Sequence, residues 1–230
     1  MKEQTLFDES YFESSPWLDY MKLREERPEM FSQSDQLMIC LDRNTVLSFM
    51  NRTGRAIGVQ YKSPFSMMVV DLVMDAGKNL FAYERLLPTV PKSAVVAITK
   101  CGEKFVLIKQ YRHSLRSDQI AFPRGFGETD LTALENAEKE LREELGASAG
   151  NIRIIGFVEP DSGLIGSRVA VVCCSVDRTE LKSGYEGIKE VLILSREELE
   201  NRIKDGTISD GFTLAAYALM SVKGEDRSEE

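Results

Sequence analysis

The chain has 230 residues, 43% of them apolar, and a formal net charge of −8. That content is enough for one sizeable core and an additional small subdomain. The negative charge argues against nucleic acid or an anionic membrane as a partner, and a phosphorylated ligand would need metal ions or a local basic pocket.

The cysteines and the start of the chain bear on its cellular compartment. Cys40, Cys101, Cys173 and Cys174 form no C-x-x-C pair, and two of them are adjacent in an apolar run. This spacing predicts reduced core thiols in a cytosolic protein. The first residues, MKEQTLFDES, are polar and acidic, and no apolar run approaches the ~20 residues of a membrane-spanning helix. We therefore expect no signal peptide, no membrane partner and a cytoplasmic location.

The first 60 residues are polar and charged, with scattered aromatic side chains. Residues 17–31 are compatible with a short amphipathic helix that Pro28 interrupts. Residues 36–41 predict a strand, and residues 43–58 are compatible with either a helix or a loop.

From residue 63 onward the pattern predicts many strands, several of them paired in hairpins, with a few helices. The predicted strands are 65–75, 80–87, a hairpin over 93–112, 152–160, 167–177 and 189–195. The predicted helices are 132–145, 195–205 and 210–223. This composition predicts an α+β fold of mixed sheets flanked by helices. The expected organisation is an N-terminal extension or small subdomain over 1–60, a main domain over 61–222 and a disordered tail over 223–230.

The helix predicted over 132–145 carries an unusual cluster of acids. At ~100° per residue, Glu140 and Glu144 lie on nearly the same line, with Glu143 beside them. Like charges at i,i+4 cost roughly 0.2–0.5 kcal/mol on an isolated helix, so stability alone does not explain the cluster. Two explanations remain open: a solvated acidic face, or oxygen ligands for a hard divalent cation such as Mg²⁺.

The surroundings of this helix resemble the Nudix hydrolase box. That family's pattern is Gly, five residues, Glu, seven residues, then Arg-Glu-apolar-x-Glu-Glu-x-Gly-apolar. Gly125, in the loop FPRGFGE, fits the first Gly, and the second half of the pattern is matched by Glu140, Leu141, Glu143, Glu144, Gly146 and Ala147.

Two positions depart from the box. Leu131 stands where the family has its first Glu, and Lys139 stands where it has Arg. In the family these two side chains pair and brace the loop. Here Glu128 is a candidate replacement, and Lys139 could pair with Glu128 or Glu135. Lys lacks the bidentate fork of Arg, so a looser brace is expected.

The flanking segments resemble the ADP-ribose and nucleotide-sugar pyrophosphatase branch of this family. The matching stretches are VLIKQYRHSLRSDQIAFPRG, EPDSGLIGSRVAVV and the segment from GYEGIKE to AAYAL, so the likeness covers about residues 63–222. It implies a Nudix-like α/β/α sandwich of mixed sheets with an N-terminal extension. The strands at 65–87 lie where this branch exchanges strands between subunits, which implies a homodimer.

The resemblance also implies roles for individual acids. Glu140, Glu143 and Glu144 would bind Mg²⁺ or Mn²⁺, with Glu143 and Glu144 central to catalysis and Glu144 the most essential. Glu186 is the candidate for a further base or ligand from a late acidic loop, with Glu180 and Glu190 as alternatives. The competing interpretation of Glu186 is an exposed loop acid.

Two arginines are the candidates for binding the substrate. Arg112 and Arg124 would contact a phosphate, since guanidinium groups suit bidentate phosphate binding. A surface salt bridge is the alternative for Arg112, and Arg168 is a further, weaker candidate.

The function that the resemblance implies is a metal-dependent pyrophosphohydrolase. Its substrate would be a small nucleoside diphosphate linked to another group, either ADP-ribose or a nucleotide sugar. The alternative is a catalytically weak or inactive Nudix-fold protein that binds a nucleotide and regulates another process. The departures at Lys139 and Leu131 keep that alternative open, whereas the retained acids argue against it. An unrelated α+β protein with a solvated acidic helix is a third interpretation.

Overall fold

The structure, a computed structural model, describes residues 6–179 and 185–224. The chain forms two compact units, each with its own core. Unit 1 comprises Met1–Thr89 with Asp161–Gly166, and unit 2 comprises Val90–Pro160 with Ser167–Glu230. Of the tail predicted at 223–230, Lys223 ends a helix and residues 225–230 lie outside the described residues. No helix in the described ranges has the length and apolar character to span a membrane.

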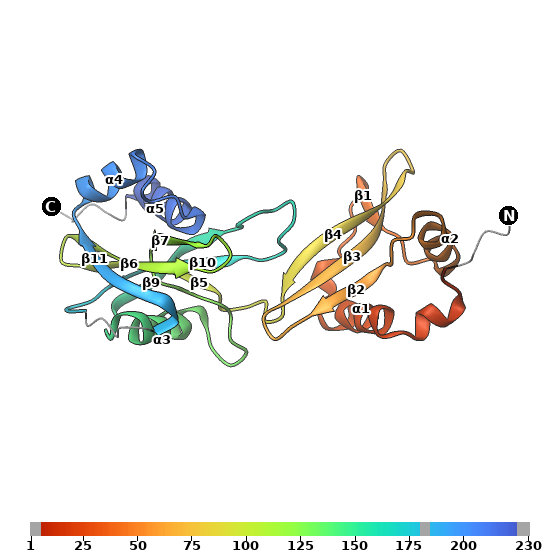
Figure 1. The fold of residues 1–230 in the computed structure, drawn as a ribbon, viewed down its shortest axis with the longest axis horizontal. Coiled ribbons are helices and arrows are strands. Elements are labelled where there is room, and N and C mark those ends of the chain that lie inside the picture. The colour runs from red at the N-terminus through yellow and green to blue at the C-terminus, as the bar shows by residue number, and fades with distance from the viewer. Residues whose placement is uncertain (1–5, 180–184, 225–230) are drawn as a thin grey trace. The chain divides into compact units, whose positions relative to one another are not determined.

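Unit 1 is an antiparallel sheet covered by short helices (Figure 1). Its helical segments are η1 (Glu9–Glu13), α1 (Ser15–Glu26), η2 (Pro28–Phe31) and α2 (Arg43–Thr53). Its strands are β1 (Leu37–Ile39), β2 (Gly58–Lys62), β3 (Ser66–Asp75) and β4 (Leu80–Pro88). β3 is the central strand: it pairs with β4 along one side and with β1 and β2 along the other.

Local sequence signals explain the helices of unit 1. α1 ends at Glu26, and Pro28 starts the separate turn η2, as predicted from the Pro that interrupts residues 17–31. The ambiguous stretch 43–58 is a helix that ends where Gly54 adopts φ 71°, followed by a strand from Gly58.

The unit boundary differs from the one expected at residue 60. The division falls at Thr89 because β2, β3 and β4 are hydrogen-bonded into one sheet. Unit 1 also includes residues 161–166, which lie far along the chain. Their backbone pairs with Leu86 on β4: Leu86 N–H donates to Leu164 O at 2.8 Å, and Gly166 N–H donates to Leu86 O at 3.0 Å.

The core of unit 1 surrounds a buried ion pair. Asp71 on β3 is 2% exposed, pairs with Arg85 Nε at 2.6 Å and accepts a hydrogen bond from the Tyr20 hydroxyl. Arg85 also donates to Met30 O at 2.8 Å and lies over the Phe31 ring. One carboxylate therefore ties α1 and η2 to the two long strands.

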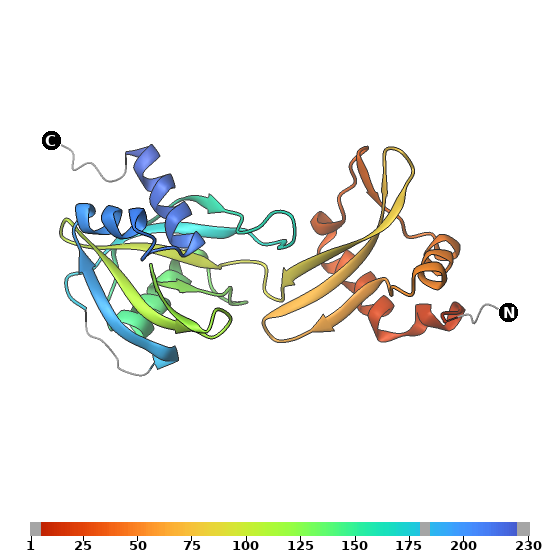
Figure 2. The same cartoon turned by 45° about the horizontal axis from the view of Figure 1, so that its top comes forward.

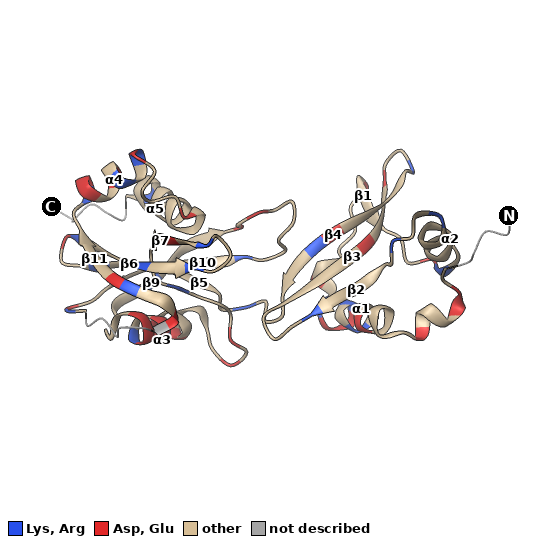
Figure 3. Cartoon of the chain, in the orientation of Figure 1, with Lys and Arg blue, Asp and Glu red and all other residues tan. Residues whose placement is uncertain are grey.

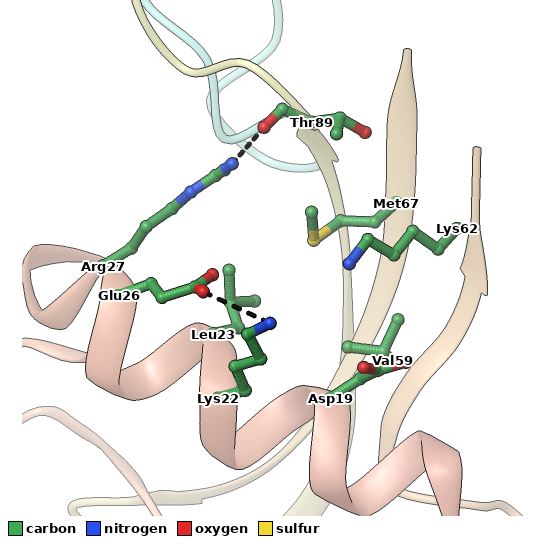
Figure 4. A pocket seen from close by; sticks show the side chains of 9 residues that line it. All are labelled: Asp19, Lys22, Leu23, Glu26, Arg27, Val59, Lys62, Met67 and Thr89. Atoms are coloured by element: carbon green, nitrogen blue, oxygen red, sulfur yellow. Dashed lines mark hydrogen bonds and ion pairs between the residues drawn. The ribbon is translucent and has the colours of Figure 1, made fainter. Parts of the chain in front are cut away.

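A hollow of about 150 Å³ lies between α1 and the β2–β3 strands of unit 1 (Figure 4). Leu23, Val59 and Met67 supply its apolar walls. Two of its charged groups already have partners: Lys22 pairs with Glu26 at 3.6 Å, and Arg27 donates to backbone carbonyls at the end of β4. This arrangement is that of a packing gap between a helix and a sheet.

Unit 2 is a sandwich with one mixed sheet at its centre (Figures 1 and 2). Its strands are β5 (Val95–Cys101), β6 (Lys104–Arg112), β7 (Ser117–Ala121), β8 (Arg124–Gly125), β9 (Gly150–Val158), β10 (Val169–Ser175) and β11 (Ile188–Leu194). Its helical segments are α3 (Ala133–Leu145), η3 (Tyr185–Gly187), α4 (Arg196–Lys204) and α5 (Gly211–Lys223). The strand order is β11-β6-β5-β10-β9, with β7 beside β6 and β8 beside β5. Among the strands that the structure describes in this sheet, β5 and β10 are the one parallel pair.

Alternating side chains of β5 build a core on each face of this sheet. Val96 and Ile98 pack with residues of α4 and α5, whereas Ala97 packs with Leu141 and Leu145 of α3. The strand is therefore buried on both sides and carries an unbroken apolar run. The predicted α/β/α sandwich of the α+β class is confirmed. The short strands β7 and β8 were not predicted, because the polar run SDQIA and a two-residue strand carry little periodic signal.

The buried ion pair of unit 1 generates the first prediction. Asp71→Ala leaves the largely buried Arg85 guanidinium without its carboxylate, so the free energy of unfolding should fall by about 3–5 kcal/mol. The matched control is Glu84→Ala on the neighbouring strand, where the pair with Arg55 is about half exposed and worth at most about 1 kcal/mol. Urea denaturation measures both. Equal losses for the two variants would contradict the assignment of Asp71 as the buried anchor.

Candidate active site at the acidic helix

Helix α3 is fixed at both ends and along its buried face. The Thr132 hydroxyl accepts the N–H of Glu135, and the Glu135 carboxylate accepts the N–H of Thr132 at 2.8 Å, which completes a capping box. Gly146 ends the helix at φ 62°. Leu141 and Leu145 are fully buried against the sheet. Because the helix cannot rotate, the directions of its carboxylates are set; Figure 3 shows acidic residues on this helix.

Glu144 is the most deeply buried of these acids, at 2% exposure. Its Oε2 accepts the backbone N–H of Arg124 at 3.3 Å. Burial, followed by the charge of Glu140, raises the pKa of Glu144 to about 8, against the lowering effect of Arg112. The carboxylate is therefore held in a place where its charged form is disfavoured.

Glu140 lies against the glycine loop that precedes the helix. A Cβ built on Gly125 would stand 2.0 Å from Glu140 Oε1, so any larger residue at this position would displace the carboxylate. Burial raises the pKa of Glu140 to about 7, and the charges of Glu143 and Glu186 act in the same direction while Lys139 opposes them. The first glycine of the motif and the first acid of its second half are thus in direct contact.

Lys139 braces the loop, as the sequence suggested. Its Nζ lies 2.5 Å from Glu128 Oε1 and 3.3 Å from Glu143 Oε2. Of the two partners considered, Glu128 is the one it contacts, and Glu135 is occupied by the helix cap. Both charges of the Glu128 pair are more than a third exposed, so the pair positions the loop more than it stabilises the fold.

Glu186 approaches the acidic helix from the segment before β11. Its backbone has φ 44°, and its carbonyl accepts a hydrogen bond from the buried Gln110 side chain at 2.8 Å. Its charge contributes to the raised pKa values of Glu140 and Glu144. Glu186 is itself exposed, which matches the competing interpretation of an exposed loop acid. Of the alternatives, Glu190 is also exposed on β11, and Glu180 lies outside the described residues.

Arg112 stands at the end of β6 beside these acids. Its Nε and Nη2 are buried and have no hydrogen-bond partner among the described residues. Burial, then the charge of Arg124, lowers the pKa of its guanidinium, while Glu144, Asp210 and Glu186 raise it. Within the described ranges Arg112 forms no surface salt bridge, and its unsatisfied donors suit an anionic oxygen.

Arg124 is held by residues that the sequence reasoning did not select. Its Nη1 lies 3.3 Å from Asp210 Oδ1, and its guanidinium lies over the Phe212 ring at 5.0 Å. The Asp-x-x-Thr spacing at Asp210 predicts a helix cap, but no local signal predicts its contact with a residue so distant in the chain. Arg168 instead pairs with Glu159 at 3.1 Å on the surface.

The chemistry of the site suits a hard divalent cation. Glu140 and Glu144 are desolvated carboxylates with raised pKa values, and neither forms an ion pair within the described ranges. Carboxylate oxygens are the ligands that Mg²⁺ prefers. Glu143 points to Lys139, and among the described residues no three acidic, Cys or His side chains already surround a common point. The donor set fits such an ion, and the assignment of ligands stays a proposal.

Three comparisons with known proteins bear on this site. A family model described as the NUDIX domain matches residues 89–211, just over half of the chain. The ADP compounds hydrolase NudE of Escherichia coli (strain K12) is 26% identical over 108 residues, which is 47% of this chain and 57% of that relative. A crystal structure of an ADP compounds hydrolase is similar with a TM-score of 0.62 and 17% identity, over 74% of this chain and 93% of that one. At this identity the structural likeness shows the fold alone.

The raised pKa of Glu144 predicts how stability depends on pH. Its ordinary pKa is 4.5 and its folded pKa is about 8, so the stability that the protonated Glu144 contributes is complete below about pH 4.5 and is lost as the pH rises through 8. Glu144→Gln should therefore stabilise the metal-free protein by on the order of 4 kcal/mol at pH 8 and by less than about 1 kcal/mol at pH 5. Urea denaturation in the presence of a chelator measures this. A difference that does not change with pH would contradict the buried, uncharged carboxyl.

Proposed function

The chain belongs to the NUDIX family. We propose that it is a metal-dependent pyrophosphohydrolase. Its substrate would be a nucleoside diphosphate linked to another group, ADP-ribose or a nucleotide sugar. The observation that carries the proposal is the convergence of desolvated carboxylates from α3 with an arginine whose buried donors have no partner among the described residues. NudE and the similar solved structure are both ADP compounds hydrolases, which favours a substrate that contains ADP.

The acids of α3 are the proposed ligands of Mg²⁺ or Mn²⁺. Glu140, Glu143 and Glu144 would hold the cations, with Glu143 and Glu144 essential for catalysis and the carbonyl of Arg124 as a further oxygen ligand. Bound cations neutralise the charge of a diphosphate and activate water. The two carboxyls of raised pKa would then bind in their charged form, because the cation compensates the burial that now disfavours it.

The arginines and the late-loop acid have separate roles in the proposed reaction. The free Nε and Nη2 of Arg112 would donate to phosphate oxygens, and Arg124 would orient the diphosphate. A carboxylate oxygen of Glu186 would take the proton of the attacking water. The water oxygen forms a bond to one phosphorus, the bridging P–O bond breaks, and the products are two phosphorylated molecules.

A substrate panel with Mg²⁺ tests this function. We expect release of AMP from ADP-ribose or a closely related ADP compound, measured against sugar nucleotides, NADH, dinucleoside polyphosphates and a nucleoside triphosphate. Glu144→Gln should lower kcat by at least ~100-fold, because the variant loses a charged ligand at the site of charge development.

The matched control is Glu138→Gln, the same change on the same helix, which should keep kcat within about twofold because this acid is not a proposed ligand. Equal losses in the two variants would argue against a specific role for Glu144. If no compound of the panel is turned over while a nucleotide binds saturably, the binding and regulatory alternative replaces the enzyme.

A homodimer is also part of the proposal. β4 forms one side of the sheet in unit 1, and from Leu80 to Arg85 it pairs with no further strand among the described residues. Phe81 on this strand is 39% exposed. An open strand edge with an exposed aromatic side chain suits pairing with a second copy. Sedimentation at micromolar concentration should therefore show a dimer, and a monomer peak would exclude it.

We place this reaction in the cytoplasm. No disulfide joins the four cysteines, all of which lie among the described residues, and Cys173 and Cys174 are buried in the core of unit 2. Free thiols are typical of proteins in reducing compartments. Fractionation of the source cells, with recovery of the protein in the cytosolic fraction, is the corresponding test.

A further inference from the structure

Asp210 divides its two carboxylate oxygens between a helix and an arginine. Oδ2 accepts the backbone N–H of Thr213 at 3.0 Å and the Thr213 hydroxyl at 2.9 Å, which caps the start of α5. Oδ1 faces Arg124 Nη1 at 3.3 Å. The Asp210 side chain is 10% exposed, so both interactions take place largely out of solvent.

The same cap also holds the chain segment that carries Arg124. The Thr213 hydroxyl, which is fully buried, accepts the backbone N–H of Phe122 at 3.0 Å. Two residues later, Arg124 donates its own N–H to Glu144. The segment is therefore bound to α5 through Thr213 and to α3 through Glu144, and Asp210 completes the connection to α5 at the guanidinium.

We propose that Asp210 is a positioning residue, which holds the Arg124 guanidinium in the orientation that receives the diphosphate of the substrate. This inference rests on the function proposed above. A long arginine side chain loses conformational freedom when it binds an anion, and a side chain already held by a carboxylate and the Phe212 ring loses less. Asp210 thus acts on substrate binding through Arg124 and touches no reacting atom.

The chain contains a matched control for this role. Asp42 caps α2 with the same Asp-x-x-Thr geometry: its Oδ2 accepts the Thr45 N–H at 2.9 Å and the Thr45 hydroxyl at 2.7 Å. Within the described residues Asp42 forms no ion pair with an arginine or lysine. Replacing either aspartate by asparagine keeps an oxygen for the cap, since Asn is as good a cap as Asp. Only in Asp210→Asn does an amide N–H₂ then face a guanidinium.

The test is steady-state kinetics with the ADP compound that the wild-type protein hydrolyses, together with calorimetric binding of ADP. Asp210→Asn should raise KM and the Kd of ADP about tenfold while kcat stays within about twofold, which is the signature of lost binding. Asp42→Asn should change neither. In an Arg124→Ala background, Asp210→Asn should raise KM no further, because the guanidinium that Asp210 holds is absent.

Three outcomes would overturn the inference. An unchanged KM in Asp210→Asn would show that Arg124 needs no such support, and an equal rise in KM when Arg124 is Ala would show that Asp210 acts by another route. Thermal unfolding of Asp210→Asn and Asp42→Asn tests for misfolding. Because both changes affect the same kind of helix cap, they should shift the unfolding midpoint by the same amount. If the wild-type protein hydrolyses no ADP compound, the proposed function fails first, before any variant is compared, and the role at a diphosphate fails with it.

Discussion

Two acids one turn apart on α3, the buried Glu144 and the partly buried Glu140, set the main constraint on unit 2. Burial alone disfavours the charged forms of Glu140 and Glu144, and the charge of Glu140 adds to the cost at Glu144. Such a pair persists only where packing leaves the helix no other position. The capping box, the turn at Gly146 and the buried leucines of α3 provide that packing, so hydrophobic burial along one side of the helix offsets the electrostatic cost on the other.

The short strand β8 connects α3 on one face of the sheet with α5 on the other. β8 pairs with β5, the strand that packs against α3 on one face and against α4 and α5 on the other. At β8, Arg124 gives its backbone N–H to Glu144 of α3 and its guanidinium to Asp210, the cap of α5. Arg124 therefore contacts both helix layers of the sandwich.

Most helices and strands could be predicted, because contacts within a few residues determine them. Thr132-x-x-Glu135 and Gly146 define α3 through contacts within a few residues, and the strands alternate or run apolar according to their burial. The end of unit 1 at Thr89 depends on pairing between strands, and the inclusion of residues 161–166 depends on hydrogen bonds with β4. The contact between Asp210 and Arg124 is likewise a product of the tertiary fold. Hydrophobic periodicity carries no information about such distant pairings. The resemblance to the family pattern did indicate the acids and arginines, because a family motif reflects residues that lie together in the folded protein.

The Lys at position 139 is explained by the loop that it faces. A box with Arg at this position pairs with a Glu further along the loop, whereas here Glu128 lies earlier and Leu131 occupies the usual place. A compact ammonium with three donors contacts Glu128 and Glu143 at once without the planar geometry that a guanidinium requires. If Glu143 binds the proposed cation, Glu128 remains as the partner of Lys139. The replacement therefore keeps the bracing role with a different geometry, and it leaves the acids of the site intact.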